Sequence, residues 1–192
     1  VSFNFNPNQY LHLSTIDHEL PTTTNETMQT ILGSGGAIGV ELAKALTKYT
    51  NEIRLVSRNP EKVNESDELL AADLTDPQQV LNAVEGSDVV YITIGFPYKA
   101  KVWKEHWPPF IKSVTDACKE HDAKLVFFDN IYMYDPDHLH GMDEKTPINP
   151  ASKKGQVRAG IAEMIMEQVR KGKLKALIAR CADFYGPDID RN

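Results

Sequence analysis

The chain has 192 residues, of which 41% are hydrophobic and 25% are charged, and its formal net charge is −6. These values are ordinary for one globular domain with a substantial core, and the acidic balance argues against a nucleic-acid partner, which would favour a basic face. No segment reaches the roughly 20 apolar residues of a membrane span, so we expect no membrane partner. Cys118 and Cys181 lie apart in apolar segments, which predicts reduced thiols and a cytoplasmic protein.

Residues 1–27 differ in composition from the rest of the chain. They are rich in Asn and Thr and lack sustained periodicity, and Met28 follows directly before an apolar segment. We therefore predict an N-terminal extension over residues 1–27, which need not be native, and one domain over residues 28–192. The alternative is a genuine N-terminal arm that packs on the domain.

From Met28 onward, strand-like and helix-like segments alternate. Strands are predicted at 29–32, 52–56, 68–72, 88–94, 124–128 and 174–180, and helices at 38–48, 77–84, 99–121 and 151–171. Asp76 is the expected N-cap of the helix at 77–84, and Trp107-Pro108-Pro109 should break or kink the helix at 99–121. Nearly continuous apolar strands that alternate with helices predict an α/β fold, a doubly wound parallel sheet with helices on both faces.

Glycines cluster between the first strand and the first helix in the spacing G-x-x-G-x-x-G. Gly33 permits a tight turn, Gly36 lets the backbone approach a pyrophosphate, and Gly39 allows close packing of helix on strand. The alternative, a plain strand–helix turn, is disfavoured by the alternating elements that follow. The residues predicted to hold a dinucleotide here, at the N-terminus of the helix, are Gly33, Gly35, Gly36, Ala37, Ile38 and Gly39.

The end of the second strand predicts which nicotinamide nucleotide binds. An acid at this point would bond the 2′-hydroxyl of NAD, but the sequence reads Ser57-Arg58-Asn59. Because Arg58 can pair with a 2′-phosphate and stack on adenine, NADP is the predicted cofactor and NAD the alternative; the simpler interpretation of Arg58 is a solvated surface side chain. After the third strand, Asp73 and Leu74 are expected beside the adenine amino group.

These residues resemble the extended short-chain dehydrogenase/reductase superfamily, in its NAD-dependent epimerase/dehydratase branch. The resemblance covers residues 28–192 and rests on the glycine turn, Asp73-Leu74-Thr75-Asp76, the strand 89–95, the segment 127–134, and Arg180–Pro187, which looks like the branch's R-x-x-x-x-Y-G-P stretch. It implies a Rossmann sheet of strand order 3-2-1-4-5-6, with the small substrate domain truncated or absent in this chain. It also implies a homodimer through the two long helices.

The resemblance further implies a cofactor and substrate surface at the carboxyl edge of the sheet. Thr93, Ile94 and Gly95 would contact the cofactor. The aromatic residues expected to contact substrate are Phe96, Tyr98, Tyr132, Tyr134 and Tyr185; for Tyr132 and Tyr134 the alternative is a role as core or rim aromatics. His138-x-His140 lacks a convincing third ligand, so no metal site is predicted.

The chain departs from the family at the residues that carry proton transfer. The family's Tyr-x-x-x-Lys pair is replaced by Lys154 and Arg158, and Asn130 stands where the family has Ser or Thr. Because Lys154 and Arg158 are four residues apart on one helix face, the charge of Arg158 would favour a neutral Lys154 amine that exchanges a proton during hydride transfer. The alternatives are two solvated or phosphate-binding cations, and an Asn130 that bonds its own backbone.

The predicted function is therefore that of an NAD(P)-dependent oxidoreductase or epimerase-like enzyme with a small-molecule substrate, a nucleotide sugar or another small carbonyl compound. The alternative, which the lost tyrosine and lysine make credible, is a non-catalytic NADP(H) sensor or binding protein.

Overall fold

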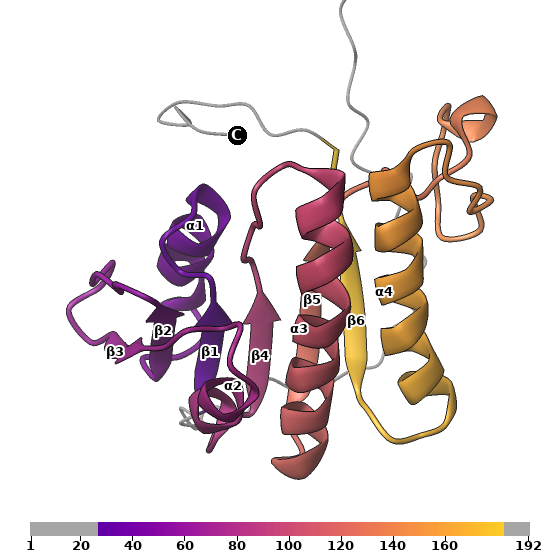
Figure 1. Cartoon of the computed structure of the whole chain (residues 1–192). Helices are drawn as coiled ribbons and strands as arrows, with labels where there is room; N and C mark the ends of the chain where they lie inside the picture. Colours follow the sequence, from indigo (N-terminus) through magenta and orange to yellow (C-terminus); the bar gives the residue numbers. More distant parts are fainter. Residues whose placement is uncertain (1–26, 183–192) are drawn as a thin grey trace, which may run out of the picture.

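A computed structural model describes residues 27–182, which form one parallel sheet flanked by helices (Figure 1). Six strands pair in the order β3-β2-β1-β4-β5-β6, which confirms the predicted doubly wound sheet. The strands are β1 (Gln29–Leu32), β2 (Ile53–Ser57), β3 (Glu68–Ala71), β4 (Val89–Ile92), β5 (Lys124–Asp129) and β6 (Ala176–Arg180). The helices are α1 (Ala37–Leu46), α2 (Pro77–Val84), α3 (Ala100–Glu120), the short 3-10 helix η1 (Pro136–His138) and α4 (Lys153–Arg170).

The helices cover both faces of the sheet, because successive strand residues point to opposite sides. Ile31 of β1 packs with Ala43 and Leu46 of α1 on one face. The next residue, Leu32, belongs to the larger core on the other face, where α2, α3 and α4 lie side by side. None of the helices in residues 27–182 is long and apolar enough to cross a membrane.

Helix α3 corrects one prediction from the sequence. It runs without interruption from Ala100 to Glu120 and includes Pro108 and Pro109, so the expected break was wrong. The two prolines remove the donors for the carbonyl groups of Lys104 and Glu105, and both of these residues are exposed, where water can hydrate the carbonyls. The buried stripe on the opposite side of the helix, Trp103, Trp107, Phe110, Ile111 and Val114, stabilises the helix by more than these two hydrogen bonds.

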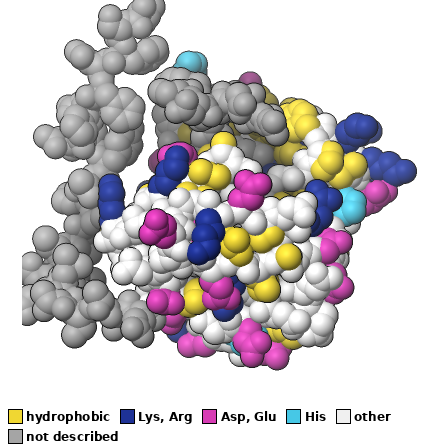
Figure 2. All heavy atoms as spheres, turned by 90° about the vertical axis from the view of Figure 1, so that its left-hand side faces the viewer, with side chains coloured by type: hydrophobic (Ala, Val, Ile, Leu, Met, Phe, Trp, Pro, Cys, Tyr) yellow, Lys and Arg dark blue, Asp and Glu magenta, His cyan; other side chains and the backbone are white. Residues whose placement is uncertain are grey.

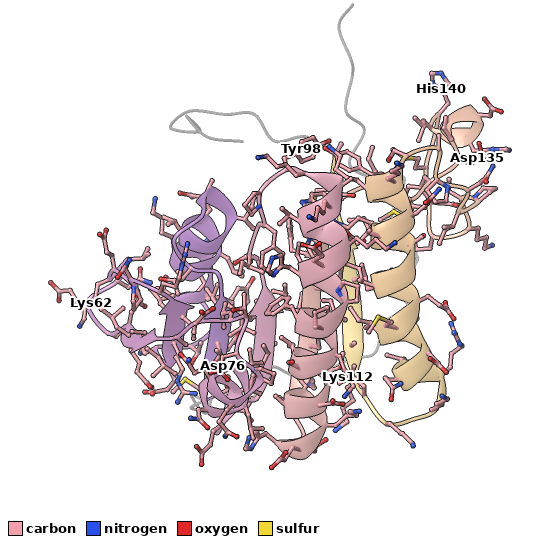
Figure 3. The ribbon with its side chains drawn as sticks, in the orientation of Figure 1. Lys62, Asp76, Tyr98, Lys112, Asp135 and His140 are labelled. Carbon is pink, nitrogen blue, oxygen red and sulfur yellow. The ribbon has the colours of Figure 1, made fainter. Side chains whose placement is uncertain are left out.

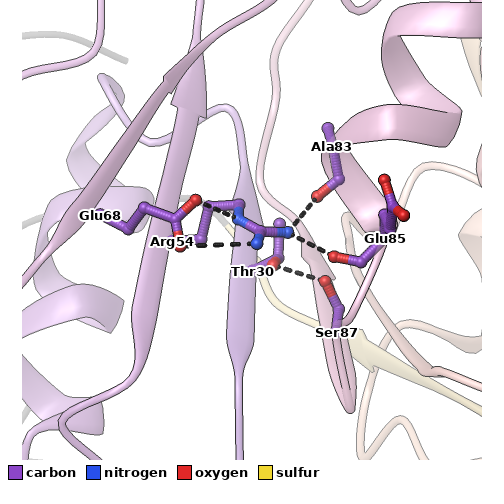
Figure 4. Close-up of polar contacts among 6 residues, drawn as sticks. All are labelled: Thr30, Arg54, Glu68, Ala83, Glu85 and Ser87. Atoms are coloured by element: carbon purple, nitrogen blue, oxygen red, sulfur yellow. Dashed lines mark hydrogen bonds and ion pairs between the residues drawn. The ribbon is translucent and has the colours of Figure 1, made fainter.

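Side chains join the elements at the edge of the sheet that contains β3. Arg54 of β2 donates to Glu68 of β3 (Nε to Oε1, 2.9 Å) and to the carbonyl oxygens of Ala83 and Glu85 at the end of α2 (3.1 and 2.7 Å) (Figure 4). The carbonyls at the end of a helix have no partner within it, so Arg54 satisfies two of them and ties α2 to the sheet. As predicted, Asp76 caps the other end of α2 by accepting from the backbone N–H groups of Gln78 and Gln79.

The connection from β2 to β3 is a loop over residues 58–67. Asp67 is buried and accepts from the N–H groups of Val63 and Asn64, and Asn64 Nδ2 donates to the carbonyl of Ala43 in α1 (3.1 Å). These bonds hold the loop against α1 and fix the point at which the chain leaves β2. Figure 2 shows this side of the molecule, where acidic and basic side chains are interspersed with apolar ones.

Candidate nucleotide-binding site

The turn between β1 and α1 is built so tightly that two of its positions accept only glycine. Gly33 has a φ of +100°, and a Cβ atom there would lie 2.5 Å from backbone atoms of Ile94. A Cβ atom at Gly39 would lie 2.8 Å from the carbonyl oxygen of Gly33 and from Cα of Ser34. Between them the turn is open, because a Cβ atom at Gly35 would meet no atom within 4 Å and one at Gly36 would meet only the Gly33 carbonyl oxygen at 3.8 Å. The backbone thus leaves room at the N-terminus of α1, where a phosphate would bind.

A cavity of about 810 Å³ begins at this turn and follows the carboxyl ends of β1 to β4. Its volume is in the range of small-molecule and cofactor sites. Most of the residues predicted to bind the cofactor line it: Gly33, Gly35, Gly36, Ser57, Arg58, Asp73, Leu74, Thr93, Ile94 and Gly95. Ala37, Ile38 and Gly39 form the first turn of α1 behind the cradle, and the side chain of Ile38 lines a separate groove between α1 and the sheet.

The end of the cavity near β2 and β3 carries the polar groups expected at the adenosine side. Ser57 Oγ is buried and has no hydrogen-bond partner in the described part of the chain, so an incoming hydroxyl or phosphate would satisfy it. Asp73 Oδ1 accepts from the backbone N–H and the hydroxyl of Thr75 (2.9 and 2.8 Å). These bonds, aided by the charge of Arg58, lower the pKa of Asp73 and keep its carboxylate ionised. The residues present therefore fit a nicotinamide nucleotide.

The loop over residues 93–99, between β4 and α3, forms the opposite wall. Thr93 Oγ1 donates to the carbonyl oxygens of Leu32 and Gly33, which holds the loop on the glycine turn. Phe96, predicted to contact substrate, lines the nucleotide cavity and stacks on His106 with a centroid distance of 5.4 Å. Five further lining residues were not foreseen: Ala72, Thr75, Pro97, Val102 and His106. Val102 and His106 are four apart on α3 and both lie before Trp107, so their helical spacing was visible in the sequence, although nothing in the sequence showed that this face meets the cavity.

Arg158 lies inside the protein, where the sequence suggested a solvated or catalytic cation. Its side chain is 8% exposed, and its guanidinium carbon lies 4.0 Å from the Trp107 ring centroid and 4.6 Å from that of Trp103. Its Nη1 lies 3.3 Å from Oδ1 of Asp129, whose side chain is fully buried, and Arg180 Nε lies 3.8 Å from the other carboxylate oxygen. Burial lowers the pKa of Arg158 to about 10 although Asp129 opposes the shift. The charge of Arg158 is thus paired with Asp129, and Arg158 does not line the cavity.

Lys154 lies one turn earlier on the same helix and is not among the residues that line the cavity. Its Nζ lies 2.7 Å from the centroid of the Tyr98 ring and 5.8 Å from that of Trp103. Trp103 contacts both cations, so Lys154 and Arg158 share a helix face as predicted. Figure 3 shows Tyr98 near the beginning of α3.

The other predicted site residues lie nearer to β5 and β6. Asn130 Oδ1 accepts from the backbone N–H of Tyr132 (3.0 Å), as in the backbone-bonding alternative, and Tyr132 stacks on Trp103 (6.4 Å, 16°). Tyr134 is buried; its hydroxyl accepts from Arg180 (3.0 Å), and it lines a second cavity of about 930 Å³ between α4 and β6. Tyr185 lies outside the described residues. His140 is on the loop after β5 (Figure 3), and no three potential metal ligands converge within residues 27–182.

Comparison with protein families matches residues 33–171 to the family described as NAD(P)H-binding. The chain belongs to the NAD(P)H-binding family. The matched segment begins at the glycine turn and extends beyond α4, so it includes the whole cavity. Membership makes this a nicotinamide-nucleotide-binding protein and confirms the resemblance drawn from the sequence.

Relatives of this NAD(P)H-binding chain include enzymes of sugar nucleotides. A dTDP-glucose 4,6-dehydratase of Mycobacterium tuberculosis is 26% identical over 137 residues, 65% of this chain and 40% of that protein. Among solved structures, a UDP-galactose 4-epimerase superposes with a TM-score of 0.74 at 22% identity, over 86% of this chain and 59% of its own. A UDP-glucose 4-epimerase from Brucella ovis in complex with NAD has the same TM-score at 18% identity, over 85% and 54%. These structures share the fold, and the chain spans about two fifths of the length of its curated relative.

The buried Asp129 predicts a pH dependence of stability. Burial raises its pKa to about 6, against the opposite influence of Arg158 and Arg180. An unfolded carboxyl titrates near ~3.9, so between these values the folded protein holds a proton that the unfolded chain has released, and stability falls as the pH rises. We expect the unfolding free energy of the native protein, relative to Asp129→Asn, to fall by on the order of 2–3 kcal/mol between about pH 4 and pH 6.5.

Urea denaturation of both proteins across this range measures the difference, and other carboxylates cancel in it. Curves that stay parallel would show that Asp129 ionises as easily in the folded state as in the unfolded one.

Proposed function

We propose that this chain binds NADP(H) in the cavity along β1 to β4 and acts as an oxidoreductase or epimerase-like enzyme on a nucleotide sugar or another small carbonyl compound. The observation that carries the proposal is the open cradle at Gly35 and Gly36, at the head of an 810 Å³ cavity in a chain of the NAD(P)H-binding family. The names of the relatives, epimerases and a dehydratase of sugar nucleotides, support the substrate class.

Each part of the nucleotide would contact a different group of residues in the cavity. The N–H groups of Gly35, Gly36 and the first turn of α1, with Ala37 and Ile38, would hold the diphosphate. Arg58 would pair with the 2′-phosphate, and Asp73 and Leu74 would face adenine. Thr93, Ile94 and Gly95 would lie along the nicotinamide half, which supplies or accepts a hydride when bound.

Lys154 is the proposed proton carrier. As a carbonyl carbon gains hydride, the Lys154 ammonium would donate a proton to the carbonyl oxygen; in the opposite direction the amine would take the hydroxyl proton. Tyr132 stacks on Trp103, the ring that Lys154 also contacts. Tyr132 and the amide of Asn130 would orient the substrate. Arg158, paired with Asp129, would fix the position of α4 and so act on the reaction through Lys154.

A second candidate is a non-catalytic NADP(H) sensor. It is favoured by the burial of Arg158, the residue at the position of the family's lysine, which is paired with Asp129 and does not line the cavity. Turnover with a panel of nucleotide sugars and small carbonyl compounds distinguishes the two, since a sensor would bind NADPH tightly without hydride transfer. A homodimer through α3 and α4 stays a prediction for either function.

Gly36→Val tests the cradle without straining the protein. A Cβ atom at this position meets only the Gly33 carbonyl oxygen at 3.8 Å, so we expect normal stability and a loss of affinity for NADPH and NADH of about 100-fold, because the side chain occupies the diphosphate position. Titration followed by nucleotide fluorescence measures the affinity. Gly160→Val, at a position on α4 that also has open space, is the matched control. If Gly36→Val and Gly160→Val bound the nucleotides with equal affinity, the glycine turn would not be part of the binding site.

Arg58→Asp tests the choice of nucleotide. Loss of a charge-assisted contact and repulsion of the 2′-phosphate should weaken NADPH binding by about 100-fold and leave NADH binding nearly unchanged. Lys62→Asp makes the same change of charge in the same loop, at an exposed position (Figure 3). It should leave the ratio of NADPH affinity to NADH affinity unchanged. Equal losses of both nucleotides in Arg58→Asp would contradict recognition of the 2′-phosphate.

Lys154→Met tests the proton carrier. It should lower kcat by about 100-fold or more while NADPH affinity stays within a few fold, because Lys154 does not line the nucleotide cavity. The pH profile of kcat, recorded with any substrate that the panel yields, measures the effect. Unchanged turnover in both Lys154→Met and Lys154→Ala would rule out Lys154 in this role.

A further inference from the structure

Lys154 reaches the surface among aromatic rings. Its Nζ lies over the face of Tyr98 at 2.7 Å from the ring centroid and 5.8 Å from the centroid of Trp103. Tyr98 stands nearly perpendicular to Trp103 (5.5 Å, 88°), and Tyr132 stacks on Trp103 (6.4 Å, 16°) and also contacts Tyr98 edge to face (6.3 Å, 72°). The ammonium thus lies against ring faces, which attract a cation electrostatically.

These rings are held by the loop that lines the nucleotide cavity. Trp103 is buried, and its Nε1 donates to the carbonyl of Phe96 (3.3 Å). The backbone N–H of Lys99 donates to the carbonyl of Pro97 (2.6 Å), which makes a tight turn with Tyr98 at its centre. Because Phe96 and Pro97 face the cavity, the segment that would contact the nucleotide also carries Tyr98 to Lys154.

We propose that Tyr98 is a positioning residue for Lys154: its ring face holds the Lys154 ammonium near Trp103, beside the 93–99 loop that lines the nucleotide cavity. A lysine side chain has four rotatable bonds, and an exposed one samples many rotamers. Tyr98 is 64% exposed, and its ring contacts the Lys154 ammonium as well as the rings of Trp103 and Tyr132. Because the ring face makes the contact with the ammonium, a phenylalanine at position 98 should still hold Lys154, whereas an aliphatic side chain should not. The consequence for catalysis rests on the proposed function; the placement of Lys154 does not.

Competitive labelling of lysines tests the placement without any substrate. A limiting amount of an amine-reactive N-hydroxysuccinimide ester is added to the full chain, and peptide mass spectrometry gives the labelling of Lys154 relative to Lys153, its exposed neighbour in the same peptide. Tyr98→Leu should raise this ratio by about three- to tenfold over the native protein, because the cation–π contact that shields the amine is lost. Tyr98→Phe should keep it within about twofold, since the ring face remains.

Two results would overturn the proposal. If the labelling ratio of Lys154 to Lys153 in Tyr98→Leu equalled that of the native protein, the ring would not hold Lys154. If the ratio rose as much in Tyr98→Phe as in Tyr98→Leu, the effect would belong to the phenol oxygen. Near-UV circular dichroism checks that each variant keeps the native packing around Trp103 and Trp107. Should Tyr98→Leu lose that signal, Tyr98→Met repeats the measurement with an unbranched side chain that also lacks a ring face.

The kinetic consequence depends on the proposed function, whereas the placement of Lys154 is tested separately from it. If Lys154 is the proton carrier, Tyr98→Leu lowers kcat more than it changes KM, because the ammonium is misplaced and the nucleotide cavity is intact. Unchanged turnover in Lys154→Met would refute the role of Lys154 in catalysis, while the labelling ratios would still decide whether Tyr98 positions it.

Discussion

The site depends on one close contact, that between Gly33 in the glycine turn and Ile94 just after β4. No side chain fits between Gly33 and the backbone of Ile94, so these two segments approach as closely as backbones can. From this point α1 leaves toward one face of the sheet, and the chain that follows β4 enters α3 on the other face. A crevice must open between them at the carboxyl edge, and the nucleotide cavity lies there. The same contact therefore sets the distance between the phosphate cradle and the 93–99 loop.

A buried ion pair sets the position of the second half of the site. Arg158 lies between Trp107 and Trp103 and pairs with Asp129 at the end of β5. Removing Asp129 would leave the charge of Arg158 unpaired in the interior, which is strongly unfavourable, so this pair favours the observed rotation of α4 against β5 and α3. Lys154 emerges one turn before Arg158 on the same face, and its position follows from that rotation. Arg158 thus acts as a fixed support for α4.

The strands and the glycine turn could be predicted because their signals are local: apolar runs of four to seven residues and a fixed glycine spacing. The strand order was expected only from the resemblance to the extended short-chain dehydrogenase/reductase superfamily. The continuity of α3 could not, since the rule about proline is local whereas the buried stripe that outweighs it is tertiary. The spacing of Lys154 and Arg158 correctly placed them on one face. It could not show that Asp129, distant in sequence, neutralises Arg158, nor that α3 brings His106 to the cavity.

If Lys154 takes the role of the family's tyrosine, as proposed, the surroundings of the proton carrier must hold an ammonium rather than a phenol. A neighbouring carboxylate would bind the ammonium as an ion pair and compete with the substrate for its proton. Within residues 27–182 no ion pair joins Lys154 to a carboxylate, and Asp129, which lies on the same side of the sheet, is paired with Arg158. Aromatic faces attract the cation without accepting its proton as a carboxylate does, so the N–H groups of Lys154 stay available to a substrate oxygen. If Lys154 is the proton carrier, as proposed, these rings would hold its ammonium in place without a carboxylate that competes with the substrate.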